Sequence, residues 1–125
     1  MSAISWNLRV NVNDGQLENF RSLMHEMVAA TKEESGTLGY EWFVAEDGST
    51  VHLNERYADS GAAMEHLGNF MANFAERFMG CVTPTSIDVY GEASDQVREA
   101  FARELEPKVR IMFKNATLYV AHSAT

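Results

Sequence analysis

The sequence predicts an α+β fold of the ferredoxin-like type, built from strands and helices in the order βαββαβ. Apolar and polar residues alternate over 4–12, as in a strand with one buried face. Two strand-like runs within 34–57 flank the pair Asp47-Gly48, which is a strong hairpin signal. Apolar residues recur at helical spacing after the first strand and again after the hairpin. An antiparallel four-stranded sheet with helices on one face accommodates this order.

The first strand is expected to turn one apolar face toward the helices; this face carries Ile4, Trp6, Leu8, Val10 and Val12. A helix follows, for which Asn13 or Asp14 is the expected N-cap, and Gln16 completes a capping box after Asn13. The apolar stripe of this helix contains Leu17, Phe20, Met24, Met27 and Val28. Ser35-Gly36 is expected to end the helix.

A two-residue turn at Asp47-Gly48 would fix the register of the hairpin. The pairs that it predicts are Val44 with Val51, Trp42 with Leu53, and Tyr40 with Glu55. The face expected beneath the helices carries Leu38, Tyr40, Trp42, Val44, Val51, Leu53, Glu55 and Tyr57. A carboxylate therefore enters an otherwise apolar and aromatic face.

A second helix is expected from a cap at Asp59-Ser60 to Gly80. Its apolar stripe, taken as core, contains Met64, Leu67, Met71, Phe74 and Phe78, with Phe70 beside it. A strand at 85–92 completes the core module, which spans about 3–92. The extension, 93–125, is expected to hold a helix capped by Ser94 and ended by Pro107, then strand-like runs at 109–113 and 117–121.

The chain is interpreted as one domain, 1–125, because its length suits a single core. The second face of the sheet is only partly polar, since Phe43 and Ala45 accompany His52, Asn54 and Arg56 there. A second copy of the same sheet is the simplest cover for such a face. A homodimer in the form of an α/β barrel is therefore predicted.

Charge and hydropathy exclude several classes of partner. The 125 residues include 10 Lys and Arg against 18 Asp and Glu, giving a net charge of -8. A basic face for nucleic acid or for an anionic membrane is not expected. No apolar run is long enough to cross a bilayer, and the first residues do not resemble a secretory signal. The single cysteine, Cys81, fits a reducing cytoplasmic location.

Two stretches, "EESGTLGYEWF" and "VHLNERYADSGAAMEHL", resemble the antibiotic biosynthesis monooxygenase family of dimeric α/β barrels. The matching positions are Glu34, Gly36, Leu38, Tyr40, Glu41, Glu55, Tyr57, Ala62, His66 and Leu67. The resemblance implies a dimer. It also implies oxygenation of phenolic polycyclic substrates without metal or flavin, as in the characterised oxygenases of the family. Other members degrade haem or have no known activity, so whether the chain is an enzyme stays open.

The expected reaction is oxidation of a small aromatic, phenolic or quinol-type metabolite. A base removes a proton, the electron-rich anion reacts with O₂, and a peroxide collapses to a quinone. Glu55 and His66 are the candidate catalytic residues, because burial raises the pKa of an unpaired carboxyl and His66 is expected to face the gap beneath its helix. The candidate substrate-binding residues are Tyr40, Trp42, Tyr57 and Phe70.

Each of these residues has a structural alternative. Glu55 can bond Tyr40, a backbone donor or solvent, His66 can be a boundary residue with a structural hydrogen bond, and the aromatic residues can belong to the core. A non-catalytic, ligand-binding or stress-associated barrel is the alternative function.

A haem-binding relative is a third possibility, with His66 as the iron ligand and Asn7 near the haem. Asn7, however, is expected to face away from the cleft. The histidines, His25, His52, His66 and His122, lack metal-ligand spacing, so no metal site is predicted.

Overall fold

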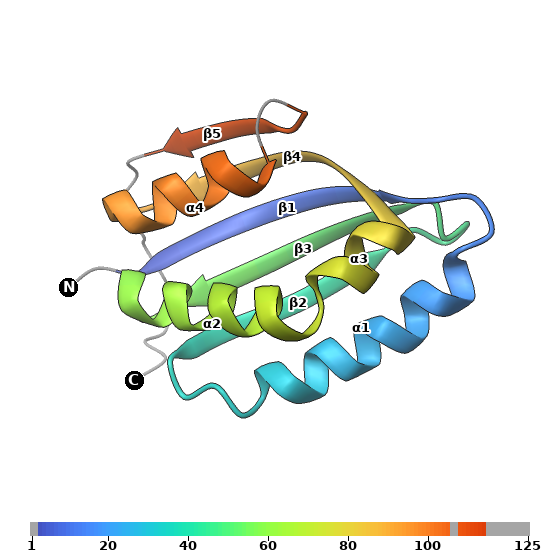
Figure 1. Ribbon diagram of the computed structural model, residues 1–125, viewed down its shortest axis with the longest axis horizontal. Coiled ribbons are helices and arrows are strands. Elements are labelled where there is room, and N and C mark those ends of the chain that lie inside the picture. The colour runs from blue at the N-terminus through green and yellow to red at the C-terminus, as the bar shows by residue number, and fades with distance from the viewer. Residues whose placement is uncertain (1–2, 106–107, 115–125) are drawn as a thin grey trace.

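The computed structural model describes residues 3–105 and 108–114. The elements along the chain are β1 (Ile4–Val12), α1 (Leu17–Thr31), β2 (Thr37–Val44), β3 (Thr50–Tyr57), α2 (Ser60–Asn73), α3 (Ala75–Cys81), β4 (Val82–Tyr90), α4 (Asp95–Leu105) and β5 (Arg110–Lys114). The helices lie together over one face of a twisted sheet (Figure 1). None of the helices in the described ranges is long and apolar enough to cross a membrane.

The sheet has the strand order β2-β3-β1-β4-β5. The first four strands pair antiparallel, and β5 pairs parallel with β4. The βαββαβ prediction and the ferredoxin-like fold are therefore confirmed, and the extension adds a fifth strand through α4. The predicted end at Pro107 and the predicted strand at 117–121 lie outside the described residues.

The hairpin has the predicted register, with Val44 opposite Val51 and Tyr40 opposite Glu55. Its turn differs from the predicted two-residue type. Gly48 has φ 74°, no residue other than glycine in the described chain has positive φ, and the Gly48 amide donates to the Ala45 carbonyl over 2.8 Å. The connection is therefore longer than predicted. The Asp47 carboxylate stabilises it by accepting from the Ser49 amide over 2.9 Å.

The predicted inward position of Leu38 is wrong. The register shifts between Thr37 and Gly39, so that Thr37 rather than Leu38 lies opposite Tyr57, and Leu38 is 46% exposed. This β-bulge leaves one residue of β2 without an opposite partner and changes the direction of its side chain.

Both predicted ends of the first helix are also wrong. Gln16 occupies the N-cap position without a side-chain cap, and Asn13 instead accepts a hydrogen bond from the Thr83 hydroxyl over 2.6 Å. The helix ends at Thr31, before Ser35-Gly36. Gly36 serves a different purpose, because a Cβ placed on it would lie 2.5 Å from the Cβ of Ala62. Its lack of a side chain lets the segment before β2 approach α2 closely.

The predicted second helix is divided in two at Phe74, whose φ of -131° is not helical. Asp59 caps α2 as predicted, by accepting from the Ala62 amide over 2.9 Å, and Ser94 caps α4 through the Val97 amide. The expected core stripe is partly wrong. The buried residues of α2 are Ala63 and His66, whereas Met64, Leu67 and Met71 border a cavity.

Two apolar clusters lie between the helices and the sheet. One surrounds Trp6 and Tyr57 and receives Phe101 from α4. The other surrounds Phe20, Val51 and Phe78. Glu55 and His66 are buried between β3 and α2, on the side of the sheet that the helices cover.

Candidate functional site

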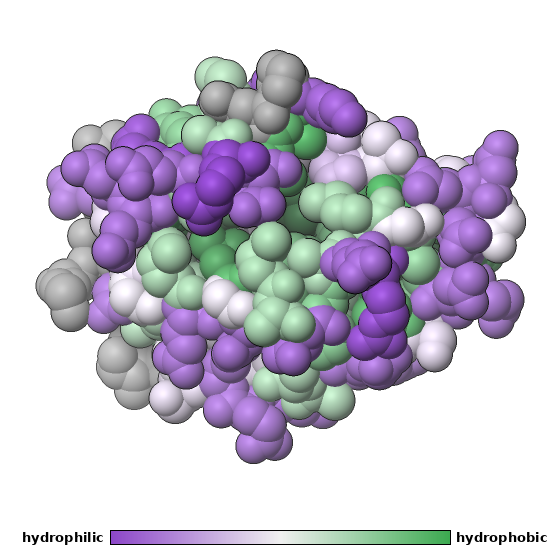
Figure 2. Space-filling view, in the orientation of Figure 1, coloured by the Kyte–Doolittle hydropathy of each residue, from purple (hydrophilic) through white to green (hydrophobic). Residues whose placement is uncertain are grey.

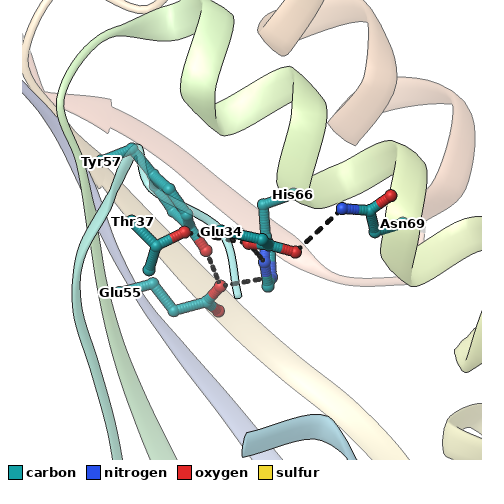
Figure 3. Close-up of polar contacts among 6 residues, drawn as sticks. All are labelled: Glu34, Thr37, Glu55, Tyr57, His66 and Asn69. Atoms are coloured by element: carbon teal, nitrogen blue, oxygen red, sulfur yellow. Dashed lines mark hydrogen bonds and ion pairs between the residues drawn. The ribbon is translucent and has the colours of Figure 1, made fainter. Parts of the chain in front are cut away.

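His66 is the centre of a chain of polar contacts between α2 and the sheet (Figure 3). Its Nδ1 lies 2.8 Å from Glu34 Oε1, and its Nε2 lies 3.1 Å from Glu55 Oε1. The Tyr57 hydroxyl donates to the same oxygen of Glu55. At least nine-tenths of each of the three ionisable side chains is shielded from solvent. The ring therefore lies between two largely buried carboxylates.

Glu34 is held in place by the segment between α1 and β2. Thr37 donates to Glu34 Oε1 over 2.9 Å, and Asn69 of α2 donates to Oε2 over 3.0 Å. The close approach that Gly36 permits brings this segment against the first turn of α2. Both oxygens of Glu34 are consequently committed to named donors, and the carboxylate is directed at Nδ1 of His66.

His66 and the two carboxylates stabilise one another in their charged forms. Burial alone would lower the pKa of His66, but hydrogen bonds and negative charge from Glu55 and Glu34 outweigh it and raise that pKa above 6.5. Burial alone would raise the pKa of Glu34. The donors Asn69, His66 and Thr37 outweigh burial and lower the pKa of Glu34 below 4.5. Because both ring nitrogens face carboxylates, the geometry favours an imidazolium that donates from each nitrogen.

The two oxygens of Glu55 differ. Oε1 accepts from Tyr57 and lies against His66, whereas Oε2 makes no hydrogen bond within the described chain. Burial first, and then the charge of Glu55, raise the pKa values of Tyr40 and Tyr57, so both phenols stay protonated at neutral pH. Glu55 therefore has a fixed orientation and one oxygen available to accept a proton.

Glu55 and His66 border a cavity of about 390 Å³ between the sheet and the helices. Most of its wall is apolar and comes from β1, β4, α2, α3 and α4. The wall includes Trp6, Leu8, Leu67, Phe70, Phe78, Ile87 and Phe101. Figure 2 shows a hollow with hydrophobic walls on the helix side, bordered by hydrophilic surface. Such a cavity suits a small, mostly apolar molecule that offers one polar group to Glu55.

The predicted site residues separate into two groups. Glu55 and His66 are brought together, and Tyr40 and Phe70 border the cavity with them. Trp42 and Tyr57 do not border it.

Trp42 packs against the rings of Phe20 and Phe78. The ring of Tyr57 lies 4.7 Å from that of Trp6 and 5.1 Å from that of His66, as centroid distances. Trp42 therefore belongs to the core, as the structural alternative describes. Tyr57 contacts Glu55 through its hydroxyl and His66 through its ring, without bordering the cavity.

Glu34 was not predicted from the sequence as a site residue. It follows a helix in an irregular segment, where no periodicity predicts the direction of a side chain. Its place in the acidic-x-Gly pattern was the available signal. Trp6 and Phe101 were also missed as cavity walls, because their contact joins the first strand to the extension; the two rings meet edge to face at 5.0 Å.

Asn7, considered above as a haem-contacting residue, lies on the open face of the sheet and donates to the side chain of Asn54. It therefore points away from the cavity, as expected. Both nitrogens of His66 are engaged by carboxylates, which leaves neither free for iron in this arrangement. The haem interpretation has no support from these two residues.

Comparisons with known proteins agree on the fold. MupZ from Pseudomonas fluorescens matches with a TM-score of 0.77 and 20% identity over 97% of each chain. SnoaB, a cofactor-independent oxygenase from Streptomyces nogalater, matches with a TM-score of 0.62 and 14% identity, over 75% of this chain and 96% of that one. A conserved protein from Methanosarcina mazei Go1 matches with a TM-score of 0.64 and 18% identity, over 72% and 92%. These identities establish the fold alone.

The match to MupZ covers nearly the whole chain, including the extension, whereas the match to SnoaB covers three quarters of it. Among curated proteins no match to the chain is found. Residues 4–73 match the sequence model described as antibiotic biosynthesis monooxygenase, which is more than half of the chain. The chain therefore belongs to the antibiotic biosynthesis monooxygenase family.

Proposed function

We propose that the protein is a cofactor-independent monooxygenase that oxidises a small aromatic, phenolic or quinol-type metabolite, with Glu55 as the base. One observation carries this proposal. Glu55 has one oxygen fixed by Tyr57 and His66 and the other without a partner in the described chain, at the wall of an apolar cavity. An oriented carboxylate in such surroundings is a suitable general base.

The first step is removal of a proton from the bound metabolite by Oε2 of Glu55. Before this step Glu34, His66 and Glu55 together carry one negative charge. After it, the same charge is on the metabolite and Glu55 is neutral. His66, held as an imidazolium by Glu34, stabilises the negative charge before and after the transfer. The site therefore needs no large reorganisation of charge.

The second step uses O₂ as the oxidant and the metabolite as the reductant. The anion donates electrons to O₂, and a bond forms between carbon and oxygen. The peroxide anion takes back the proton held by Glu55, which gives a hydroperoxide and restores the carboxylate. Loss of water then converts that carbon to a carbonyl, so one oxygen atom enters the product and the other leaves as water. The apolar walls, Phe70 and Trp6 among them, exclude bulk water from this intermediate.

The proposed assembly is a homodimer through the open face of the sheet. Phe43 is 55% exposed there and Met112 of β5 is 41% exposed. Asn7 Oδ1 and Arg56 Nε are shielded from solvent yet lack a hydrogen-bond partner among the described residues. A second copy would supply apolar cover and polar partners for this face. A cytoplasmic location stays a prediction from the sequence.

Oxygen consumption with a panel of hydroquinones and anthrones tests the proposed reaction. Glu55→Gln keeps the shape of the side chain and removes its basicity, so we expect turnover to fall by about a hundredfold or more. The double variant Glu55→Gln, His66→Ala should be no faster. Glu26→Gln is the matched control, because Glu26 is exposed and pairs with Arg77 away from the cavity.

Equal slow rates in the wild-type protein and in Glu55→Gln would contradict the proposal. Together with measurable binding of the same compounds, that outcome would favour the non-catalytic, ligand-binding barrel.

A further inference from the structure

The rim of the cavity carries two charged side chains that the proposed reaction does not use, Arg103 and Glu104. Arg103, near the end of α4, is the one Lys or Arg among the cavity-lining residues in the described part of the chain. It belongs to the extension, which lies outside the family match at residues 4–73. We propose that Arg103 selects ligands with an acidic substituent and fixes their orientation. This inference rests on the proposed function, because it concerns the substrate of the same cavity.

The guanidinium of Arg103 is available for a ligand. Its Nε lies 3.1 Å from Glu104 Oε1, and its two terminal nitrogens make no hydrogen bond within 3–105 and 108–114. Adjacent residues on a helix do not face each other, so this contact is a weak, solvent-exposed pair. The Arg103 side chain is 67% exposed. The terminal nitrogens can therefore form the paired hydrogen bonds that a carboxylate accepts from arginine.

The negative charge inside the cavity, opposite in sign to Arg103, determines which end of a ligand binds at the rim. Glu34 and Glu55 flank His66, so the group carries a net negative charge where the reaction is proposed to occur. A carboxylate on the ligand is repelled from that group and attracted to the rim. The ionisable but uncharged phenol or ketone of the same ligand is then left beside Glu55. Long-range repulsion from the net charge of -8 is screened in physiological salt, so it does not keep an anionic ligand from the rim.

Two other arginines of the extension are already engaged. Arg98 of α4 lies over the Phe113 ring of β5 at 4.4 Å, and Arg110 approaches Asp88 on the open face at 3.8 Å. Neither of them borders the cavity. The apolar part of the ligand would lie against Trp6 and Phe101, which form the wall next to α4. The substrate class that we infer is a small aromatic molecule with a carboxylate at the end remote from its oxidised ring.

Two fluorescent probes that differ by one acidic group test this inference without turnover. They are anilinonaphthalene sulfonate and N-phenylnaphthylamine, the same ring system without the sulfonate. Competition between them establishes that they share one site. We expect Arg103→Gln to raise the Kd of the sulfonate probe about fivefold and to leave that of the neutral probe unchanged. Added salt should weaken binding of the sulfonate probe to the wild-type protein and have little effect on its binding to Arg103→Gln.

Glu104→Gln should have the opposite effect and lower the Kd of the sulfonate probe, because it removes the negative charge next to Arg103. Arg21→Gln is the matched control, since Arg21 pairs with Glu18 on α1. Equal changes for both probes in Arg103→Gln, or no change for either, would overturn the inference. If neither probe bound to the wild-type protein, the cavity would be excluded as the site of an aromatic anion, and the inference with it.

These outcomes are separate from those of the oxygen assay. A protein that binds the sulfonate probe through Arg103 but consumes no O₂ loses the proposed function and keeps the rim contact. A protein that oxidises neutral and acidic hydroquinones with the same KM, in both wild type and Arg103→Gln, keeps the proposed function and loses the inference.

Discussion

Two polar clusters lie on opposite faces of the same sheet and differ in how completely they are satisfied. The inner polar cluster consists of Glu34, Glu55, Tyr57, His66 and Asn69, beneath the helices. The outer polar cluster consists of Asn7, Arg9, Asn54, Arg56 and Asp88, on the face that no helix covers (Figure 1). In the inner cluster each charged group meets at least one partner of opposite charge. In the outer cluster, Asn7, Arg56 and Asp88 each retain a shielded atom without a hydrogen bond in the described chain.

The difference concerns the two clusters and not the whole of each face, because Trp42 Nε1, beneath the helices, is also shielded without a hydrogen-bond partner among the described residues. Shielded polar groups are nearly always hydrogen-bonded in folded proteins, and unsatisfied ones cost stability. Asp88 is only 6% exposed although it lies on the uncovered face, because Arg9 and Arg110 extend across it. The charged groups of the inner cluster are paired within one chain, and Oε2 of Glu55 is the oxygen left for a ligand at the cavity. The outer cluster needs another surface, which supports the proposed pairing of two sheets.

The largest expected effect is on the inner cluster. His66→Ala would leave two largely buried carboxylates facing each other without a cation. We expect a loss of about 3 kcal/mol in the free energy of unfolding, measured by denaturant titration. His25→Ala, at an exposed position on α1, should change it by no more than about 0.5 kcal/mol. A loss below about 1 kcal/mol for His66→Ala would mean that water solvates Glu34 and Glu55 in the folded protein. The two clusters would then not differ in stability as described.

A smaller effect is expected from pH. The folded pKa of His66 is raised, so its contribution is fully present below 6.5 and is lost as pH rises through the folded pKa. The folded pKa of Glu34 is lowered, so its contribution is present above 4.5 and is lost as pH falls through the folded pKa.

The difference in unfolding free energy between wild type and His66→Ala should thus be largest between pH 4.5 and 6.5. Denaturation over a pH series measures it. A difference that does not vary with pH would contradict the assigned charges.

The smallest effect on the stability of the single chain is expected at the open face. Phe43 is 55% exposed, so Phe43→Lys should change the free energy of unfolding of a monomer by no more than about 0.5 kcal/mol. It should nevertheless dissociate the proposed dimer, because each copy would place a charge in an apolar interface. Sedimentation equilibrium measures the mass. Ala72→Lys, on the exposed surface of α2, is the control, and a monomeric wild type would refute the pairing.

Much of the sheet was predictable because the pattern of a strand or a hairpin is contained in a short stretch of sequence. Alternation over 4–12 and the Asp47-Gly48 signal predicted the inward face of β1 and the register of the hairpin, even though the turn itself was wrong. The bulge at Leu38 was not predictable in this way, since it depends on how the segment before β2 meets α2. The break at Phe74 was missed for the same reason: the apolar spacing continues through it without interruption.

The candidate site was predictable only in part. Glu55 was found because a carboxylate interrupts an apolar strand face, and His66 because it faces the sheet from a helix. Glu34, the second carboxylate that contacts His66, comes from an irregular segment 32 residues before it, and only the folded chain brings the two together. Met64 and Met71 of α2 were predicted to be core residues because helical spacing identifies an apolar face. It does not tell whether side chains or a cavity lie against that face. Met71 is 46% exposed beside the cavity.

The central place of β1 in the sheet has a consequence for synthesis. Its two neighbours, β3 and β4, both follow it in the chain, and β4 ends only at Tyr90. Until those segments leave the ribosome, Ile4–Val12 has both backbone edges free and an apolar face uncovered. For much of translation β1 therefore has unpaired backbone groups that can hydrogen-bond to another chain. The sheet is complete only after β4 and β5 have been synthesised.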